Sequence, residues 1–276
     1  MLKDFLQSGE SIVVPGTYDA LSALVAAEAG FKAIYLSGFG VAGSLLGKPD
    51  IGLVSAEQMI TRVGEVVGAT GTTPVIADGD NGYGDESAVA HLVRSYEQAG
   101  AQCIQLEDQV SPKRCGHMDN KEVVELEEAA SKIAMAVQSR ESDNFLIMAR
   151  TDSRATHDLN EALRRSEAFL KAGADILFVE APTSIEEMQT IKSEFPDTVL
   201  VANMVENGKT PELQVSELEE MGYQLILRPI SGLLAVVKTL QQSYGALLND
   251  DFKAMRAISR LTFQEYNQVV KLSDYN

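Results

Sequence analysis

One local pattern occurs four times along the chain and limits the folds that it can adopt. In each case a helix-like segment ends on a small residue followed by glycine, and a short apolar run begins at once. The four instances are residues 26–37, 96–107, 169–180 and 218–229. A glycine just beyond a helix can take the left-handed conformation that pairs the last carbonyl groups, so each instance predicts a helix end. The run that follows is continuous and apolar, which is typical of a strand covered by helices on both faces.

Eight apolar runs of this kind are predicted to be strands. They cover residues 11–14, 33–37, 74–78, 103–107, 145–150, 176–180, 199–203 and 224–228. Helical patterns separate them, among others at residues 87–99, 122–138, 159–171, 185–193 and 211–221. Alternation of strand and helix about eight times over roughly 230 residues predicts an α/β protein with a (β/α)8 TIM barrel. A doubly wound open sheet is the alternative, but no glycine-rich dinucleotide or phosphate loop follows the first strand.

The chain shows no linker and no domain boundary, so residues 1–276 are predicted to form one barrel domain. Residues 243–276 are surplus to a minimal barrel and have helical patterning, for example at 252–260. We expect this extension to pack outside the barrel or against a second subunit. Because the extension can contact a second subunit, we predict that the protein is a homo-oligomer.

The charge balance limits which classes of partner the protein can bind, and the cysteine count indicates its cellular compartment. With 23 Lys and Arg against 40 Asp and Glu, the net charge of −17 argues against binding to nucleic acid or to an anionic membrane. Two cysteines are too few for a disulfide scaffold and indicate a reducing compartment. No apolar stretch of secretory or membrane-spanning type is present. These features predict a cytoplasmic enzyme without a membrane partner.

Polar residues end nearly every predicted strand, directly after four or five apolar ones. The residues at these ends are Ser37, Asp78, Asp80, Glu107, Asp108, Arg150, Asp152, Glu180, Asn203 and Arg228. A solvated loop would also be polar, so no single residue indicates a site. In barrels of this kind, however, the active site lies at the C-terminal ends of the strands. The recurrence therefore predicts that these side chains converge at one barrel mouth.

Three carboxylates in this set suggest a metal site. Asp78, Asp80 and Glu107 come from two adjacent strands, and carboxylates this close repel one another unless a cation or shared protons offset the charge. Oxygen ligands without histidine suit Mg²⁺ or Mn²⁺ and not zinc, and Mg²⁺ usually keeps several waters with one or two direct carboxylates. The alternative is that these acids pair with nearby Lys and Arg side chains.

The segment after the fourth strand combines a lysine, an arginine, a cysteine and a histidine within residues 113–117. Neighbouring cations lower the pKa of a thiol, so Cys115 is a candidate thiolate or acid/base group. Cys103 lies within an apolar strand and is predicted to be a core residue. One Cys and one His do not make a zinc site, and no nucleophile elbow is present for a serine triad.

Several motifs of the chain resemble those of the isocitrate lyase and phosphoenolpyruvate mutase superfamily. The sequence KRCGH at 113–117 resembles the K-[KR]-C-G-H signature of that family, and DGDNGYG at 78–84 is similar to its metal-binding strand. The strand ends IQLEDQ at 104–109 and MARTD at 148–152 also match, as do YLSG at 35–38 and GKPD at 47–50. The similarity runs in order over nearly the whole chain. It implies a TIM barrel, usually tetrameric, whose last helices are exchanged between subunits.

The resemblance implies a magnesium-dependent carbon–carbon lyase of the 2-methylisocitrate or 2,3-dimethylmalate type. Such an enzyme cleaves C2–C3 of a 2-hydroxy di- or tricarboxylate to a 2-oxo acid, such as pyruvate, and a second carboxylate, such as succinate. By this analogy Cys115 protonates the departing carbon, Lys113 and His117 stabilise its charge, and Glu107 completes the catalytic group. Mg²⁺, with Mn²⁺ as a substitute, would be held by Asp78 and, largely through water, by Asp80 and Glu107. The substrate residues implied are Tyr18, Ser37, Gly38, Phe39, Asp50, Arg150, Glu180 and Asn203.

Other activities remain open at this point. Met118 and Asp119 follow the histidine where methylisocitrate lyases usually have Arg and Pro, and residues 202–211 look more like the 2,3-dimethylmalate lyase branch. Oxaloacetate hydrolases use a serine near the end of the eighth strand, where Pro229 stands here with Ser231 close by. A phosphonate mutase or hydrolase, of the phosphoenolpyruvate or carboxyphosphonoenolpyruvate mutase kind, is a further alternative, although that branch generally lacks Cys-Gly-His. A barrel that only binds a metabolite is disfavoured by the complete set of candidate groups.

Overall fold

The structure, a computed structural model, describes residues 1–116 and 120–275. It divides into two compact units, Met1–Ser231 and Gly232–Asn276. The first unit is built on a closed barrel of eight parallel strands in which each strand pairs with the next along the chain. The strands are β1 (Ile12–Thr17), β2 (Ile34–Leu36), β3 (Val75–Asp78), β4 (Cys103–Glu107), β5 (Leu146–Thr151), β6 (Ile176–Val179), β7 (Val199–Asn203) and β8 (Leu225–Arg228). The predicted (β/α)8 barrel is confirmed.

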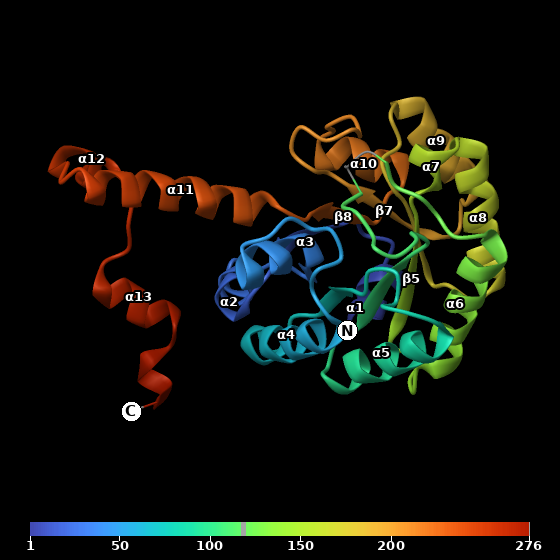
Figure 1. Ribbon diagram of the computed structural model, residues 1–276, viewed down its shortest axis with the longest axis horizontal. Coiled ribbons are helices and arrows are strands. Elements are labelled where there is room, and N and C mark those ends of the chain that lie inside the picture. The colour runs from blue at the N-terminus through green and yellow to red at the C-terminus, as the bar shows by residue number, and fades with distance from the viewer. Residues whose placement is uncertain (117–119, 276) are drawn as a thin grey trace. The chain divides into compact units, whose positions relative to one another are not determined.

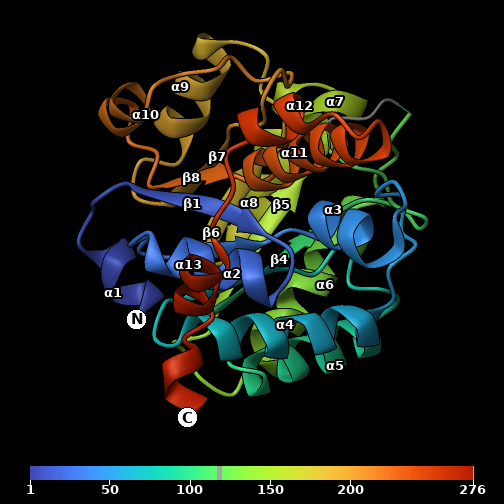
Figure 2. The ribbon, with the colours of Figure 1, turned by 90° about the vertical axis from the view of Figure 1, so that its left-hand side faces the viewer.

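Helices surround the barrel, as Figures 1 and 2 show for the first unit. The main ones are α2 (Ala20–Glu28), α4 (Ala56–Thr70), α5 (Glu86–Gln98), α6 (Leu126–Ser139), α8 (Leu159–Lys171), α9 (Ile185–Glu194) and α10 (Val215–Met221). Three short turns lie near the strand ends: α3 (Gly38–Val41), the π-helical η1 (Ala42–Leu46) and α7 (Ser153–Thr156). The four repeated glycines all have left-handed backbones, with φ between 90° and 100°. They end helices as the sequence pattern predicts.

The barrel closes between its first and last strands. Residues of β1 pair in register with β8, for example Ile12 with Leu225 and Val14 with Leu227. Just beyond this pairing Gly16 lies against the backbone of Pro229, where an added Cβ would be 1.8 Å from the carbonyl oxygen. Only glycine fits this seam, because any side chain would force the two strands apart.

A short N-terminal helix, α1 (Leu2–Gln7), contributes to the core of the barrel. Its Leu2 and Leu6 join a cluster of buried side chains from the strands, including Val14, Met148 and Phe178. The sequence pattern does not predict this helix, since six residues are too few to show a helical period. Its two leucines pack in the same core as the side chains of the strands.

The second unit consists of helices that expose many apolar side chains. It comprises most of α11 (Ser231–Leu248), with α12 (Phe252–Ala257), α13 (Phe263–Val269) and a 3₁₀ turn, η2 (Leu272–Tyr275). The extension was expected from residue 243, but α11 is one continuous helix through that position. The boundary between the units therefore lies further upstream, at Ser231. In the part of the chain described, no helix is both long and apolar enough to cross a bilayer.

Candidate active site

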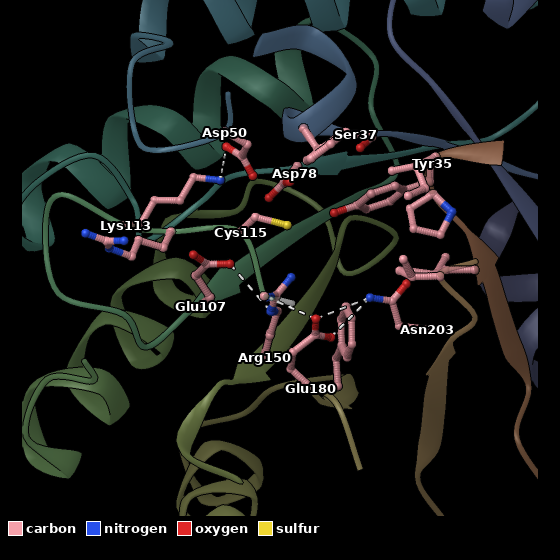
Figure 3. Close-up of a pocket in the computed structure, with 18 residues that line it drawn as sticks. Tyr35, Ser37, Asp50, Asp78, Glu107, Lys113, Cys115, Arg150, Glu180 and Asn203 are labelled. Atoms are coloured by element: carbon pink, nitrogen blue, oxygen red, sulfur yellow. Dashed lines mark hydrogen bonds and ion pairs between the residues drawn. The ribbon is translucent and has the colours of Figure 1, made fainter. Parts of the chain in front are cut away.

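A cavity of about 240 Å³ opens at the C-terminal ends of the strands (Figure 3). Strands β2 to β8 each place at least one side chain on it, at or just past the strand end. These residues are Tyr35, Ser37, Asp78, Glu107, Arg150, Phe178, Glu180, Asn203 and Leu227. The convergence expected from the sequence is therefore present, and it follows from parallel strands that all end at one mouth.

Asp78 is held at the end of β3 by three donors. Its Oδ2 accepts a hydrogen bond from the backbone N–H of Gly38 at 3.1 Å, and its Oδ1 accepts bonds from Asp80 N–H and from Gln105 Nε2, both at 3.1 Å. The hydroxyl of Tyr35 in turn donates to Gln105 Oε1 at 2.9 Å. Sequence reasoning assigned no role to Tyr35 or Gln105. The sequence clue to both is a hydrogen-bonding side chain in the middle of a largely apolar strand.

Lys113 joins the loop after β4 to two acids. Its Nζ lies 2.6 Å from Asp50 Oδ1 and 2.6 Å from Asp80 Oδ1. Burial works to lower the pKa of Lys113, but Asp80, Glu107 and Asp50 outweigh it and raise that pKa well above its ordinary value. Lys113 is therefore a buried ammonium and not a base. Asp80 itself has a left-handed backbone, with φ 46°, which is uncommon for a residue with a side chain.

Burial shifts two of the carboxyl groups toward their neutral forms. It raises the pKa of Asp80 to about 6 against the opposing effect of Lys113, and it raises the pKa of Glu107 well above its ordinary value against that of Arg150. Glu107 Oε2 lies 3.5 Å from Arg150 Nε, whereas its buried Oε1 has no hydrogen-bond partner. An unpaired buried carboxylate oxygen is costly unless a ligand or ion meets it.

The site region has too few cations for its acids. Among the described residues, seven acids and four cations are buried, so the acids outnumber the cations by three. They are Asp50, Asp78, Asp80, Glu107, Asp108, Asp152 and Glu180 against Lys113, Lys121, Arg150 and Arg165. This excess and the oxygen donors suit a divalent cation that keeps much of its water.

The acids do not, however, form a ready-made cage. Within the described residues no three His, Cys, Asp or Glu side chains lie close enough together to hold a metal ion. The ammonium of Lys113 lies against Asp80 Oδ1 at 2.6 Å, so the expected metal site stays a prediction in which Asp80 would act through water. One direct carboxylate with the others reached through water is compatible with this geometry and is common for Mg²⁺.

Arg150 is held by acids on three sides. Its Nε and Nη2 donate to the two oxygens of Asp152 at 2.9 and 3.1 Å, and Nη2 lies 3.5 Å from Glu180. Asn203 donates to Glu180 at 3.1 Å. Two N–H groups of Arg150, which was expected to bind substrate, are thus engaged with Asp152. A substrate carboxylate would meet the remaining N–H groups of the guanidinium.

The loop after β4 carries Cys115 into the cavity. Figure 3 shows its thiol among Asp78, Glu107 and Arg150. The loop is fixed at Arg114, whose backbone N–H and carbonyl both bond to the side-chain amide of Gln109, at 2.9 and 2.8 Å. Cys115 N–H also donates to the carbonyl of Asp50 at 3.2 Å. His117, predicted as a catalytic residue, lies outside the described residues.

Three predicted site residues are not part of the cavity lining. Tyr18 is buried and packs against Gly40 of α3, where an added Cβ would lie 2.8 Å from the Tyr18 Cβ. Gly38 reaches the site only through its bond to Asp78, and Asp80 lies behind Lys113. The others that the structure describes line the cavity: Ser37, Phe39, Asp50, Glu107, Lys113, Cys115, Arg150, Glu180 and Asn203, with Asp78.

One wall of the cavity is apolar, which the sequence reasoning missed. Its residues come from β6, β8 and the loops after β7 and β8: Phe178, Leu227, Val205, Pro229 and Ile230. Ser231 is not part of the lining, and its hydroxyl hydrogen-bonds to Glu206.

Comparison with known proteins places the chain among enzymes. The family model for phosphoenolpyruvate phosphomutase matches residues 2–248. The chain is 44% identical over 271 residues to a 2,3-dimethylmalate lyase of Eubacterium barkeri, an alignment that covers 98% of the chain and 93% of that protein. It is 40% identical over 284 residues to a 2-methylisocitrate lyase of Aeropyrum pernix, covering 100% and 88%.

Solved structures of several activities share the fold. A crystal structure of 2,3-dimethylmalate lyase superimposes with a TM-score of 0.93 at 34% identity, covering 99% of this chain and 91% of that one. Oxaloacetate acetylhydrolase with 3,3-difluorooxalacetate gives 0.93 at 31%, covering 99% and 93%. Phosphonopyruvate hydrolase with oxalate and Mg²⁺ gives 0.88 at 26%, covering 99% and 95%. Because different reactions share this fold, the reaction must be argued from the residues of the site.

Proposed function

Since the chain belongs to the phosphoenolpyruvate mutase and isocitrate lyase superfamily, we propose that it is a carbon–carbon lyase that cleaves a 2-hydroxy di- or tricarboxylate between C2 and C3. Two relatives that match it over nearly its full length are named as lyases of this kind. The observation that carries the proposal is the Cys115 thiol, which the β4 loop holds among Asp78, Glu107 and Arg150 (Figure 3).

The chain's own groups account for each proton in this cleavage. The ionised carboxylate of Glu107, which its raised pKa makes a stronger base, receives the proton of the 2-hydroxyl at Oε1 as C2 becomes a carbonyl. The electrons of the C2–C3 bond move into the carboxylate on C3, and the Cys115 thiol then protonates that carbon. The products are a 2-oxo acid and a second carboxylate. Arg150 holds a substrate carboxylate, and the Lys113 ammonium stabilises the negative charge that develops.

Mg²⁺ is the cofactor that the site residues fit best. Asp78 would hold it directly and Asp80 and Glu107 largely through water, since all three offer oxygen and the buried acids of the region outnumber its cations. When bound, the ion supplies positive charge to the 2-hydroxyl and its neighbouring carboxylate. Mn²⁺, which takes the same ligands, is expected to replace it.

The apolar wall favours a substrate with alkyl groups over one with a third carboxylate. The side chains of Phe178, Val205 and Ile230 give a carboxylate nothing to bond, whereas they bury a methyl or ethyl group favourably. A dialkyl or monoalkyl malate of the 2,3-dimethylmalate type is therefore the expected substrate, ahead of 2-methylisocitrate.

A hydrolase that acts on oxaloacetate is the second candidate, supported by the similarity in fold. The serine that would favour it is not in the cavity. Pro229 lines the cavity, and Ser231 lies outside the lining with its hydroxyl directed to Glu206. This arrangement supports the lyase.

A substrate screen tests the proposed function directly. Purified protein with Mg²⁺ is incubated with 2,3-dimethylmalate, 2-alkylmalates, 2-methylisocitrate, isocitrate, oxaloacetate and phosphonopyruvate, and the 2-oxo acid and oxalate are measured. We expect the alkylmalates to give the highest kcat/KM. The variant Ser231→Ala should match the wild type, because the hydroxyl lies outside the cavity. Release of oxalate from oxaloacetate as the main activity, lost in Ser231→Ala, would establish the hydrolase instead.

We also propose that the protein is a homo-oligomer, a tetramer by analogy with its family, in which the second unit helps to join subunits and is exchanged between them. The support is its exposed apolar surface: Leu248 is 86% exposed and Phe263 83% exposed. Such surface in a monomer favours association. Residence in the cytoplasm stays a prediction from the cysteine content.

Sedimentation velocity checks the assembly. We expect the wild type to sediment as an oligomer at micromolar concentration and Leu248→Glu to shift it toward smaller species, because a charge would have to be buried in the contact. The matched change Gln241→Glu adds the same charge on α11 at an exposed polar position and should have little effect. A fully active wild-type monomer would rule out this role of the second unit.

A further inference from the structure

Lys121 is a buried lysine to which nothing above gives a function. Its side chain is 1% exposed, and its Nζ contacts two acceptors from different parts of the site. One is Asp152 Oδ1 at 2.6 Å, and the other is the backbone carbonyl of Gly116. Gly116 follows Cys115 directly, and Asp152 holds Arg150. We propose that Lys121 is a positioning residue that fixes the Cys115 thiol relative to the Arg150 guanidinium.

The contact with Asp152 controls how Arg150 is presented. Asp152 is completely buried, and its two oxygens accept from Arg150 Nε and Nη2 as well as from Lys121. Its backbone N–H donates to Asp108 at 2.9 Å, which fixes the backbone that carries this carboxylate. Two cations share one fixed carboxylate, and the direction of the Arg150 guanidinium depends on both of them.

The contact with Gly116 controls the position of the thiol. Gly116 lies so close to the Arg150–Glu180 pair that an added Cβ would be 2.0 Å from Glu180 Oε1 and 2.2 Å from Arg150 Nη2. Before Cys115 the loop is held by Gln109 at Arg114 and by the carbonyl of Asp50. After Cys115 the described bond to the loop is the one from Lys121. The thiol is thus held from both sides.

The backbone around Lys121 is itself fixed, so the side chain can act as a rigid tie. Val123 forms an antiparallel bridge with Gln109, and the N–H of Val110 donates to the carbonyl of Glu122 at 3.0 Å. Lys121 therefore extends from an ordered segment to the loop on one side and to Asp152, just past the end of β5, on the other. Loss of this tie would leave each partner in place but let the distance between them vary.

Such variation affects the rate more than substrate binding. In the proposed reaction Arg150 holds the substrate and Cys115 protonates it, so the distance between them decides whether the proton reaches the carbon. A displacement of about 1 Å can cost roughly 10²-fold in rate. Only the kinetic part of the inference rests on the proposed function, because the position of the thiol can be measured without a substrate.

The test compares Lys121→Met and Lys121→Arg with the matched change Lys171→Met, which removes an exposed lysine paired with Glu167 on α8. Three quantities are measured: steady-state kcat and KM on the best alkylmalate, the rate at which iodoacetamide alkylates Cys115, and the thermal midpoint. Peptide mass spectrometry separates Cys115 from the fully buried Cys103, which serves as an internal control.

We expect Lys121→Met to lower kcat about 10- to 100-fold with a much smaller change in KM. Alkylation of Cys115 should change at least about threefold in rate, as it does when a local contact opens, while Cys103 stays unmodified. Lys121→Arg, which keeps the charge, should recover part of both, and Lys171→Met should match the wild type. Should Lys121→Met not fold, Lys121→Gln takes its place with the same readouts.

A lowered thermal midpoint with unchanged kcat and alkylation would show a purely structural role and overturn the inference. A wild type that cleaves no alkylmalate would refute the proposed function instead, and the alkylation rates would still decide whether Lys121 positions the thiol.

Discussion

Replacing Cys115 by serine is expected to lower kcat by about 10²–10⁴-fold, the usual contribution of a general acid. This corresponds to about 3–5 kcal/mol in the barrier. Serine preserves the approximate shape of the side chain, but its hydroxyl gives up a proton far less readily than a thiol. KM and Mg²⁺ affinity should change little, because Asp78, Ser37 and Arg150 are untouched. Steady-state kinetics and calorimetric binding on the variant measure both effects.

Cys103→Ser is the matched control for this change. Cys103 is fully buried in β4, and burial raises the pKa of its thiol well above its ordinary value. The same exchange of sulfur for oxygen there should lower thermal stability while the folded enzyme keeps its kcat. If Cys115→Ser turns over the best substrate within about threefold of the wild type, Cys115 is not the acid, and a mutase-like or hydrolase-like reaction becomes the better interpretation.

Removal of divalent metal is expected to abolish turnover. Protein treated with EDTA and exchanged into metal-free buffer should lose its activity, and Mg²⁺ or Mn²⁺ should restore it. Without the ion, the negative charge that develops on the 2-hydroxyl oxygen would lie beside buried acids that outnumber the cations. Asp78→Ala should not be restored by either ion at concentrations that saturate the wild type. Calorimetric titration with Mg²⁺ should show its binding weakened by at least about tenfold.

Glu57→Ala, which removes an exposed acid in the first turn of α4, controls for a general loss of negative charge. Full activity of the chelated wild type would contradict the metal requirement and with it the assignment of Asp78.

The barrel could be predicted because its signals are local. The helix-ending glycines and the apolar runs after them each lie within a dozen residues, and the strands begin and end within three residues of the expected positions. The helix α1 could not be predicted this way, since its burial depends on strands far along the chain. The extension was expected to begin at residue 243, whereas α11 runs through that position without interruption and the two compact units divide at Ser231.

The site was predictable as a set of residue types at strand ends but not as a network. Asp78, Glu107, Cys115 and Arg150 are marked by position and motif. Gln105 contacts Asp78 across 27 positions of the chain, and Lys121 contacts Asp152 across 31. No local sequence pattern predicts contacts between residues this far apart. The same holds for Tyr18, which was expected to contact substrate but lies outside the cavity lining and packs against Gly40.

The seam between β1 and β8 sets a condition on how this chain can be made. Strand pairing cannot be completed until the ribosome has released residues as late as Arg228, since Pro15 finds its partner only there. Until then an incomplete barrel has two open strand edges, and such edges readily pair with other chains. Contacts that span more than 200 residues also form slowly. During synthesis the nascent chain therefore passes through a long interval in which it is prone to aggregation and a substrate for chaperones.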